Sequence, residues 1–180
     1  MADIMTIIKE RRSVRNYEIR DLEDEQLKTL LEAIKWSPSW ANTQCWEVIV
    51  VKDSNIKKML QQTLPKNNPA YKAIAEASIV IAMCAKLGKS GFYKGSYVTK
   101  FDDWFMFDIG IATQSLCLAA YFLGLGTVIV GLFDHDKAKS ILQVPSGHEV
   151  VVLIPVGYPK KLPSAPKRKN IEEFTHYDVF

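Results

Sequence analysis

The stretch DIGIATQSLCLAAYFLGLGTVIVGLFD, residues 108–134, carries no charged side chain between its first and its last aspartate. Its length alone would allow a membrane span, which takes about 20 apolar residues. The polar pair QS and the helix-breaking LGLG divide the stretch into a helical part and the β-branched run TVIV. We therefore expect a buried core helix over 104–123 followed by a buried strand over 127–132, and no membrane span.

Similar patterns continue on both sides of this stretch. Apolar residues at helical spacing predict further helices at 3–10, from Asp24 to the Ser37-Pro38 turn, after Asp53 and at 134–142. Continuous apolar runs predict strands at 46–51, 77–85 and 150–156. Because strands and helices alternate, the pattern indicates an α/β or α+β sheet protein.

Two segments lack such a pattern. Residues 86–103 mix glycine, lysine and aromatic side chains without a period, so we expect a mobile loop or lid there. The tail 158–180 is basic and contains prolines, and its apolar ending EEFTHYDVF favours wrapping around another surface over fraying. A chain of 180 residues has the length of one domain, so we interpret 1–180 as a single domain that includes this tail.

Charge and cysteine content narrow the partners and the compartment. A net charge of +3 is too small to indicate a nucleic-acid or membrane partner, so we expect small molecules or a second copy of the chain. The 3 cysteines form an odd count without a C-x-x-C pair, and the N-terminus MADIMTIIKERRS has no apolar signal core. Both features favour a cytoplasmic protein.

Several well-known catalytic motifs fail on this sequence. GLGTVIVG ends a helix and enters a strand, whereas a dinucleotide-binding fingerprint must follow a strand and open a helix. GKS at 88–90 lacks the earlier glycine of a phosphate-binding P-loop. The 3 histidines lack metal-ligand spacing, and no G-x-S-x-G elbow supports a serine nucleophile. The patterns therefore favour neither a metal site nor a protein nucleophile.

Two short stretches do suit a ligand. RRSVR at 11–15 gathers arginines and a hydroxyl, which either complement the end of the preceding helix or bind phosphate oxygens. PSWANTQCW at 38–46 places several amide and hydroxyl groups between two tryptophans, more than a turn requires, so we interpret it as a binding loop. The basic group KRK at 167–169 lies near the other terminus and is able to converge on the same anion.

These stretches belong to a series that resembles a known family over nearly the whole chain. In order, the matching motifs are RRSVRNY, SPSWANTQCWEVIVV, DIGIATQSLCLAAYFLGLGTVIVGLFD, VVLIPVGYP and KRKNIEEFTHY, and together they resemble the FMN-dependent nitroreductase family. The resemblance implies an α+β, three-layer fold with a mixed central sheet flanked by helices, in an intertwined homodimer. It also implies FMN at the dimer interface, contacted by both chains.

The resemblance assigns the implied cofactor contacts to three groups. The ribityl phosphate and the pyrimidine side of the flavin would be held by Arg11, Arg12, Ser13 and Arg15. The partner chain would supply Pro38, Ser39, Trp40, Asn42 and Gln44. The flavin would be flanked by Gln114, Gly131 and Leu132, and its phosphate would be reached by Lys167 and Arg168.

The chain departs from the family pattern at Trp40, Cys45 and Leu132. Family members usually have a small residue, a proline and a glycine or similarly small residue at these positions. The bulk of Trp40 and Leu132 predicts a narrowed or aromatic-lined substrate pocket. Asn67 and Asn68 match the family's flavin contact in their region poorly and are weaker candidates.

The function that the resemblance implies is an NAD(P)H-dependent FMN oxidoreductase with a ping-pong cycle. NADH or NADPH would reduce the flavin, and a nitro compound, a quinone or an activated alkene would then accept the electrons. The alternative hypothesis is a flavin-binding protein that stores or senses FMN with little turnover. Because the cofactor carries the chemistry, neither hypothesis requires a catalytic side chain.

Overall fold

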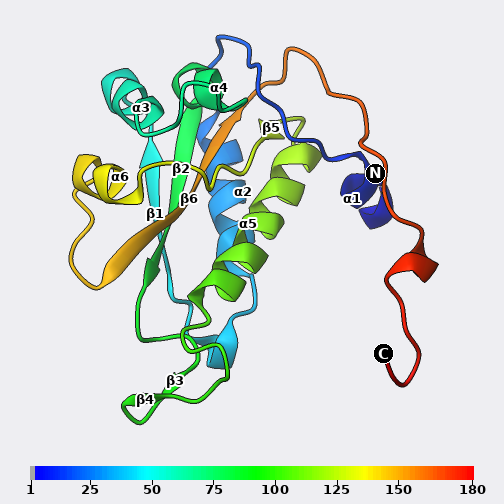
Figure 1. The fold of residues 1–180 in the computed structure, drawn as a ribbon. Helices are drawn as coiled ribbons and strands as arrows, with labels where there is room; N and C mark the ends of the chain where they lie inside the picture. The colour runs from blue at the N-terminus through cyan, green and yellow to red at the C-terminus, as the bar shows by residue number, and fades with distance from the viewer. Residues whose placement is uncertain (1–2) are drawn as a thin grey trace.

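The centre of the molecule is a four-stranded sheet in the order β1-β2-β6-β5 (Figure 1), seen in a computed structural model that describes residues 3–180. The strands are β1 (Trp46–Val51), β2 (Ile79–Lys86), β5 (Gly126–Thr127) and β6 (His148–Gly157). All three neighbouring pairs are antiparallel. β2 is a central strand whose first seven residues are all buried, which explains its continuous apolar sequence.

Helices cover both faces of the sheet and confirm the three-layer α+β prediction (Figure 1). One face carries α2 (Asp24–Lys35) and α5 (Phe105–Phe122), which pack on Ile81 and Met83 of β2. The other face carries α3 (Ser54–Gln61), α4 (Tyr71–Glu76) and α6 (His135–Ile141). Successive β2 residues alternate between these two cores because neighbouring side chains of a strand point to opposite faces.

α5 is the predicted core helix, and it is also long and apolar enough to span a membrane. Its inner side, which includes Ile109 and Leu116, is buried against the sheet and α2. Its outer side is exposed and still apolar, with Met106 at 61% exposure and Phe107 at 58%. Beyond the helix, Gly124 adopts φ +75° and turns the chain toward the sheet, as the LGLG run predicts.

The strand predicted at 127–132 is wrong in extent. β5 has only two residues, and the next contact with β6 is the isolated bridge between Val130 and Leu153. A competing partner explains the interruption, because Ser13 forms a parallel bridge with Thr127 and the Val14 amide donates to the Thr127 carbonyl at 2.8 Å. This bridge is the parallel component of an otherwise antiparallel sheet.

Two further elements were not predicted. α4 follows the PKNNP loop and was missed because its six residues are too few to show a helical period. The segment 86–103, predicted as a mobile loop or lid, contains a short hairpin of β3 (Phe92–Tyr93) and β4 (Ser96–Tyr97). The Phe92 and Tyr97 rings meet edge to face across it, with centroids 5.2 Å apart.

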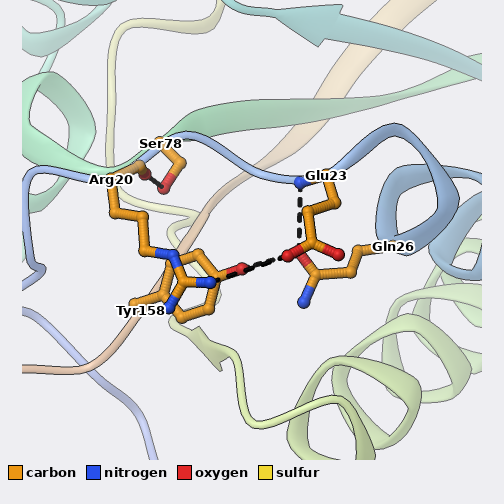
Figure 2. A network of polar contacts seen from close by, with 5 residues as sticks. All are labelled: Arg20, Glu23, Gln26, Ser78 and Tyr158. Atoms are coloured by element: carbon orange, nitrogen blue, oxygen red, sulfur yellow. Dashed lines mark hydrogen bonds and ion pairs between the residues drawn. The ribbon is translucent and has the colours of Figure 1, made fainter.

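A polar network joins the segment before α2 to the end of β6 (Figure 2). The Arg20 guanidinium lies 3.8 Å from the centre of the Tyr158 ring and 3.6 Å from the Glu23 carboxylate. The Tyr158 hydroxyl and the Glu23 amide both donate to the Gln26 side-chain oxygen, and the Ser78 hydroxyl donates to the Arg20 carbonyl. These contacts hold residues 20–26 against Ser78 and Tyr158.

α1 (Ile4–Glu10) and the end of the tail lie outside the three layers (Figure 1). The tail begins with a hydrogen bond from the Lys160 amide to the Asn16 carbonyl and later forms a short 3₁₀ turn at Ile171–Glu173. Large apolar side chains are exposed on both elements, including Ile4 at 60% and Phe174 at 60%. Apolar exposure of this extent is typical of an interaction surface.

Candidate functional site

The loop 38–46 has an unusual backbone. It contains a 3₁₀ turn at Trp40–Asn42, and three non-glycine residues adopt positive φ: Ala41 at 46°, Asn42 at 54° and Gln44 at 47°. Left-handed conformations are unfavourable for such residues and persist only where surrounding contacts hold them. One such contact is internal, because the Ser39 hydroxyl accepts a hydrogen bond from the Gln44 amide at 2.9 Å.

The main external contact of this loop is the carboxylate of Asp108, in the first turn of α5. This side chain is fully buried. One oxygen accepts the Trp40 amide at 3.0 Å, and the other accepts the Ser90 hydroxyl at 2.7 Å and the Cys45 thiol at 3.6 Å. A buried carboxylate is tolerated only when its oxygens are paired in this way. The sequence prediction missed Asp108, because an acid in the first turn of a helix ordinarily complements the helix dipole at the surface.

The Cys45 thiol beside this carboxylate is a proton donor. Burial, as the larger cause, and the negative charge of Asp108 together raise the pKa of Cys45 to about 12. The thiol is therefore protonated at neutral pH, and it cannot act as a nucleophile there. Its role is to donate to Asp108.

The side chains of the same loop face outward. Asn42 and Gln44 are exposed, and the Gln44 amide donates to the Asn42 side-chain oxygen at 3.2 Å. The Thr43 hydroxyl is buried and finds no hydrogen-bond partner within residues 3–180. The Thr113 hydroxyl in the core of α5 is in the same state, so this feature is not specific to the loop.

The predicted cationic group at 11–15 is fixed by backbone contacts. Val14 is 1% exposed and packs on Gly126 so closely that an added Cβ on the glycine would lie 2.7 Å from the Val14 Cβ. Together with the Val14 to Thr127 hydrogen bond, this close approach fixes the segment against β5.

The arginines of this group differ in their contacts. Arg12 donates to the Lys9 carbonyl at 2.6 Å and to the Arg11 carbonyl at 2.9 Å, so it complements the end of α1. Arg15 makes one long contact, to the Ser13 carbonyl at 3.2 Å. Arg11 has no side-chain hydrogen bond within the described part of the chain. Arg11 and Arg15 therefore keep most of their donors for a ligand.

The amide loop and the cationic group lie at opposite ends of α5. The loop is bound to Asp108, in the first turn, whereas the helix before the arginines contacts the last turn through a 2.8 Å hydrogen bond from Tyr121 to Glu10. The α-helix rises about 20 Å between these two positions. One chain therefore does not bring the two predicted groups together.

Gln114 lies between these ends, on the exposed side of α5. It lines a hollow of about 510 Å³ whose other walls are mostly apolar. The lining residues are Met106, Phe107, Gly110, Ile111, Gln114, Ser115 and Leu118. The floor includes Gly110, where an added Cβ would meet nothing within 4 Å.

The remaining predicted residues lie apart from this hollow. Gly131 and Leu132 are exposed after the Val130 bridge, and the Leu132 carbonyl accepts from the Asn68 side chain at 3.3 Å. The Gly131 carbonyl lies 3.2 Å from a ring nitrogen of His135. Asn68, a weak candidate by sequence, therefore lies beside Leu132.

Lys167 and Arg168 are exposed in the tail. In the described residues, neither forms an ion pair, and the side-chain hydrogen bonds of the tail beyond residue 161 stay within it. Both side chains are therefore free, within residues 3–180, of ion-pair partners that would compete with an anionic ligand.

A helix-covered antiparallel sheet with separate cationic and amide-rich groups defines an α+β protein suited to a flat, phosphate-bearing ligand. The profile of the nitroreductase family matches residues 8–158, which is most of the chain. The chain belongs to the nitroreductase family.

Individual relatives agree with this assignment. A Methanothermobacter thermautotrophicus protein, named for NADH dehydrogenase or NAD(P)H nitroreductase activity, is 30% identical over 96% of this chain and 88% of its own length. FMN reductase [NAD(P)H] of Bacillus subtilis is 25% identical over 100% of this chain and 75% of its own. The structure of an FMN-dependent nitroreductase from Clostridium difficile R20291 has the same fold, with a TM-score of 0.84, 24% identity and coverage of 98% and 100%.

Proposed function

We propose that this protein is an NAD(P)H-dependent FMN oxidoreductase that reduces a small acceptor such as a nitro compound, a quinone or an activated alkene. Its membership of the nitroreductase family supports the enzyme class and the flavin cofactor. The name of the Bacillus subtilis relative, FMN reductase [NAD(P)H], supports the same cofactor and the same electron donor.

The residues present fit FMN at both of its ends. Arg11 keeps guanidinium donors for a phosphate, which arginine binds in a bidentate manner, and Arg15 keeps donors for the pyrimidine side of the ring. The outward amides of Asn42 and Gln44 suit the hydrogen-bonding edge of the flavin. The mostly apolar hollow beside Gln114 suits the flat ring.

The observation that carries the proposal is the separation of these groups along α5. A single FMN cannot contact both ends of one α5, which are about 20 Å apart along the helix. A two-fold related copy that packs α5 against α5 brings the first turn of one chain beside the last turn of the other. The site is therefore complete only in a homodimer, with the loop 38–44 supplied by the partner.

The exposed apolar surfaces support this homodimer. The outer side of α5, α1 and the tail all carry large exposed apolar residues, and a second copy would bury them. In the dimer the tail wraps the partner and carries Lys167 and Arg168 to the phosphate of the cofactor. Dimerisation would also cover the outer side of α5, which agrees with a cytoplasmic protein rather than a membrane protein.

The protein's part in the reaction is to bind and orient the cofactor and to restrict the access of acceptors to it. When bound, FMN would supply the redox chemistry that links NAD(P)H to the acceptor. Arg15 would hold the pyrimidine side of FMN, where its positive charge would stabilise negative charge. Trp40, half-buried at the loop, and Leu132, 67% exposed, add bulk near the ring and narrow the space for an acceptor.

A second function follows if this bulk excludes the nicotinamide as well. The protein would then bind FMN tightly and store or sense it, with little turnover. Both functions use the same cofactor residues, so the rate of flavin reduction separates them.

The test is anaerobic stopped-flow absorbance of the FMN-loaded protein mixed with NADH and, separately, with NADPH. Bleaching of the flavin band on a catalytic timescale with either donor supports the oxidoreductase. Tight FMN binding without bleaching by either donor contradicts it and favours storage or sensing. A protein that binds no FMN contradicts both functions.

A further inference from the structure

The buried carboxylate of Asp108 joins two segments that are far apart in sequence. Its first oxygen accepts the Trp40 amide of the loop 38–46, and its second accepts the hydroxyl of Ser90, from the segment 86–103. Asp108 and Ser90 are both 0% exposed, so water does not compete for these hydrogen bonds.

Ser90 is the fixed base of the hairpin formed by β3 and β4. The Trp104 amide donates to the Ser90 carbonyl at 3.0 Å, and the Val98 amide donates to the Gly91 carbonyl at 2.9 Å. Gly91 adopts φ +73°, and an added Cβ there would lie 2.5 Å from the Asp102 carbonyl oxygen. The hairpin therefore rises from a tightly closed base whose buried hydroxyl points to Asp108.

We propose that Asp108 is a positioning residue that couples the hairpin segment 86–103 to the flavin-facing loop 38–46. The strained backbone at residues 41–44 is held where it meets the cofactor because Asp108 holds the Trp40 amide. Ser90 holds the same carboxylate in place from the other side. A change at the base of the hairpin is thus transmitted to the loop through one side chain.

This inference rests on the proposed function only in naming the cofactor that the loop faces. The coupling itself is a property of the protein, and it predicts that events at the hairpin alter the loop. A ligand that orders the hairpin would tighten Ser90 on Asp108 and thereby the loop beneath it.

The first experiment is hydrogen–deuterium exchange of the full chain, with and without FMN, in peptides that cover 38–46, 90–98 and the central strand 79–86. Asp108→Ala should speed exchange at the Trp40 amide on the order of 10- to 100-fold, because a charge-assisted hydrogen bond is lost. Asp108→Asn should restore most of the protection, because its amide oxygen still accepts from Trp40. Ser90→Ala should speed exchange in 38–46 several-fold, although Ser90 lies outside that loop.

The matched control is Ile109→Val, which trims the buried residue next to Asp108 on α5 and removes no side-chain hydrogen bond. It should leave the exchange rates of 38–46 and 90–98 as in the wild type. In an Asp108→Asn background, Ser90→Ala should speed exchange in 38–46 by a smaller factor than it does alone, because the effects of coupled residues are not additive. The visible circular dichroism of bound FMN should change with Ser90→Ala and stay constant with Ile109→Val.

Three outcomes would overturn the coupling. The first is that Ser90→Ala speeds exchange in 90–98 but not in 38–46. The second is that Asp108→Asn does not restore the protection lost in Asp108→Ala. The third is that Ile109→Val speeds exchange in 38–46 as much as Ser90→Ala does. If Asp108→Ala does not fold, the Ser90 and Asn variants decide the question. A wild-type chain that binds no FMN contradicts the proposed function, yet its loop exchange still tests the coupling.

Discussion

The two ends of α5 hold their halves of the candidate site by different means. At the first turn, the loop 38–46 keeps a strained backbone through hydrogen bonds to one buried carboxylate, Asp108. At the last turn, the segment 11–15 has its backbone fixed by β5 and the close packing of Val14 on Gly126, while Arg11 and Arg15 extend from it.

The two ends differ in whether the groups that hold the backbone are also the groups that contact the ligand. At the cationic end, the arginine heads can be removed without disturbing the packing that fixes the segment. At the amide end, the backbone geometry and the ligand-facing groups depend on the same hydrogen bonds. Mutations of the arginines at the cationic end should therefore change the affinity for the ligand alone. Mutations in the loop 38–46 should change both the affinity and the local order of the backbone.

The largest effect is expected from removing the two free arginines. Arg11→Ala and Arg15→Ala should each weaken FMN binding by about 1.5–3 kcal/mol, because each removes a charge-assisted contact to the cofactor. Titration of flavin fluorescence measures the dissociation constant. Arg12→Ala is the matched control, since Arg12 is engaged at the end of α1 and should affect FMN binding far less. An equal loss for all three variants would contradict this division of roles.

The packing that supports the arginines should respond through stability. Gly126→Ala places a methyl group against Val14 and should lower the free energy of unfolding by about 1–3 kcal/mol. Urea unfolding followed by circular dichroism measures the change. The double variant Gly126→Ala/Val14→Gly should lose less stability than the sum of the two single variants, because it removes the Val14 Cβ and both methyl groups that the added Cβ would meet. Additive losses would show that the close approach is not the cause.

At the end of the site formed by the loop 38–46, Cys45 should make the free energy of unfolding depend on pH in the alkaline range. The folded pKa of Cys45 is raised to about 12 from an ordinary value of 9.0, so the folded state favours the protonated thiol. The stabilisation is complete below pH 9 and is lost as the pH rises toward 12, with a slope of up to about 1.4 kcal/mol per pH unit. Cys45→Ser keeps a donor to Asp108 and should reduce the slope in unfolding experiments between pH 8 and 10.5. An unchanged slope would exclude Cys45 as a contributor.

The smallest effect concerns access to the site rather than its support. Trp40→Ser should lower the KM for a bulky nitroaromatic acceptor by roughly tenfold, since space near the ring is regained. The KM for a small quinone should stay nearly constant, which serves as the internal control. Steady-state kinetics at saturating NAD(P)H distinguish the two acceptors. Equal changes for both acceptors would contradict a narrowed pocket at Trp40.

The sequence predicted the parts of the fold that are set by burial. The runs that form β2 and α5 are recognisable because β2 is buried on both faces and α5 is buried along one face. The strand 127–132 was overextended because its β-branched residues could not show that residues 13–14 compete for Thr127. α4 and the β3–β4 hairpin were too short to leave a periodic signal.

The candidate site was predictable in composition and not in arrangement. The motifs at 11–15 and 38–44 identify suitable groups, but only the fold shows that they lie at opposite ends of α5. Asp108 was missed because it stands at the boundary of an uncharged run and resembles an exposed first-turn acid. Its three donors come from residues 40, 45 and 90, and such tertiary pairing leaves no local pattern.

The central claim is that one FMN site is built from two chains, and a hybrid dimer tests it most directly. One chain carries Arg11→Ala/Arg15→Ala, and the other carries Asn42→Gly/Gln44→Gly, in which glycine accepts the positive φ without strain. Each variant alone should bind FMN weakly, and the purified hybrid should bind one FMN tightly per two chains, because one of its two sites receives intact halves. A hybrid that binds FMN no better than either parent would place all the contacts within one chain and contradict the account.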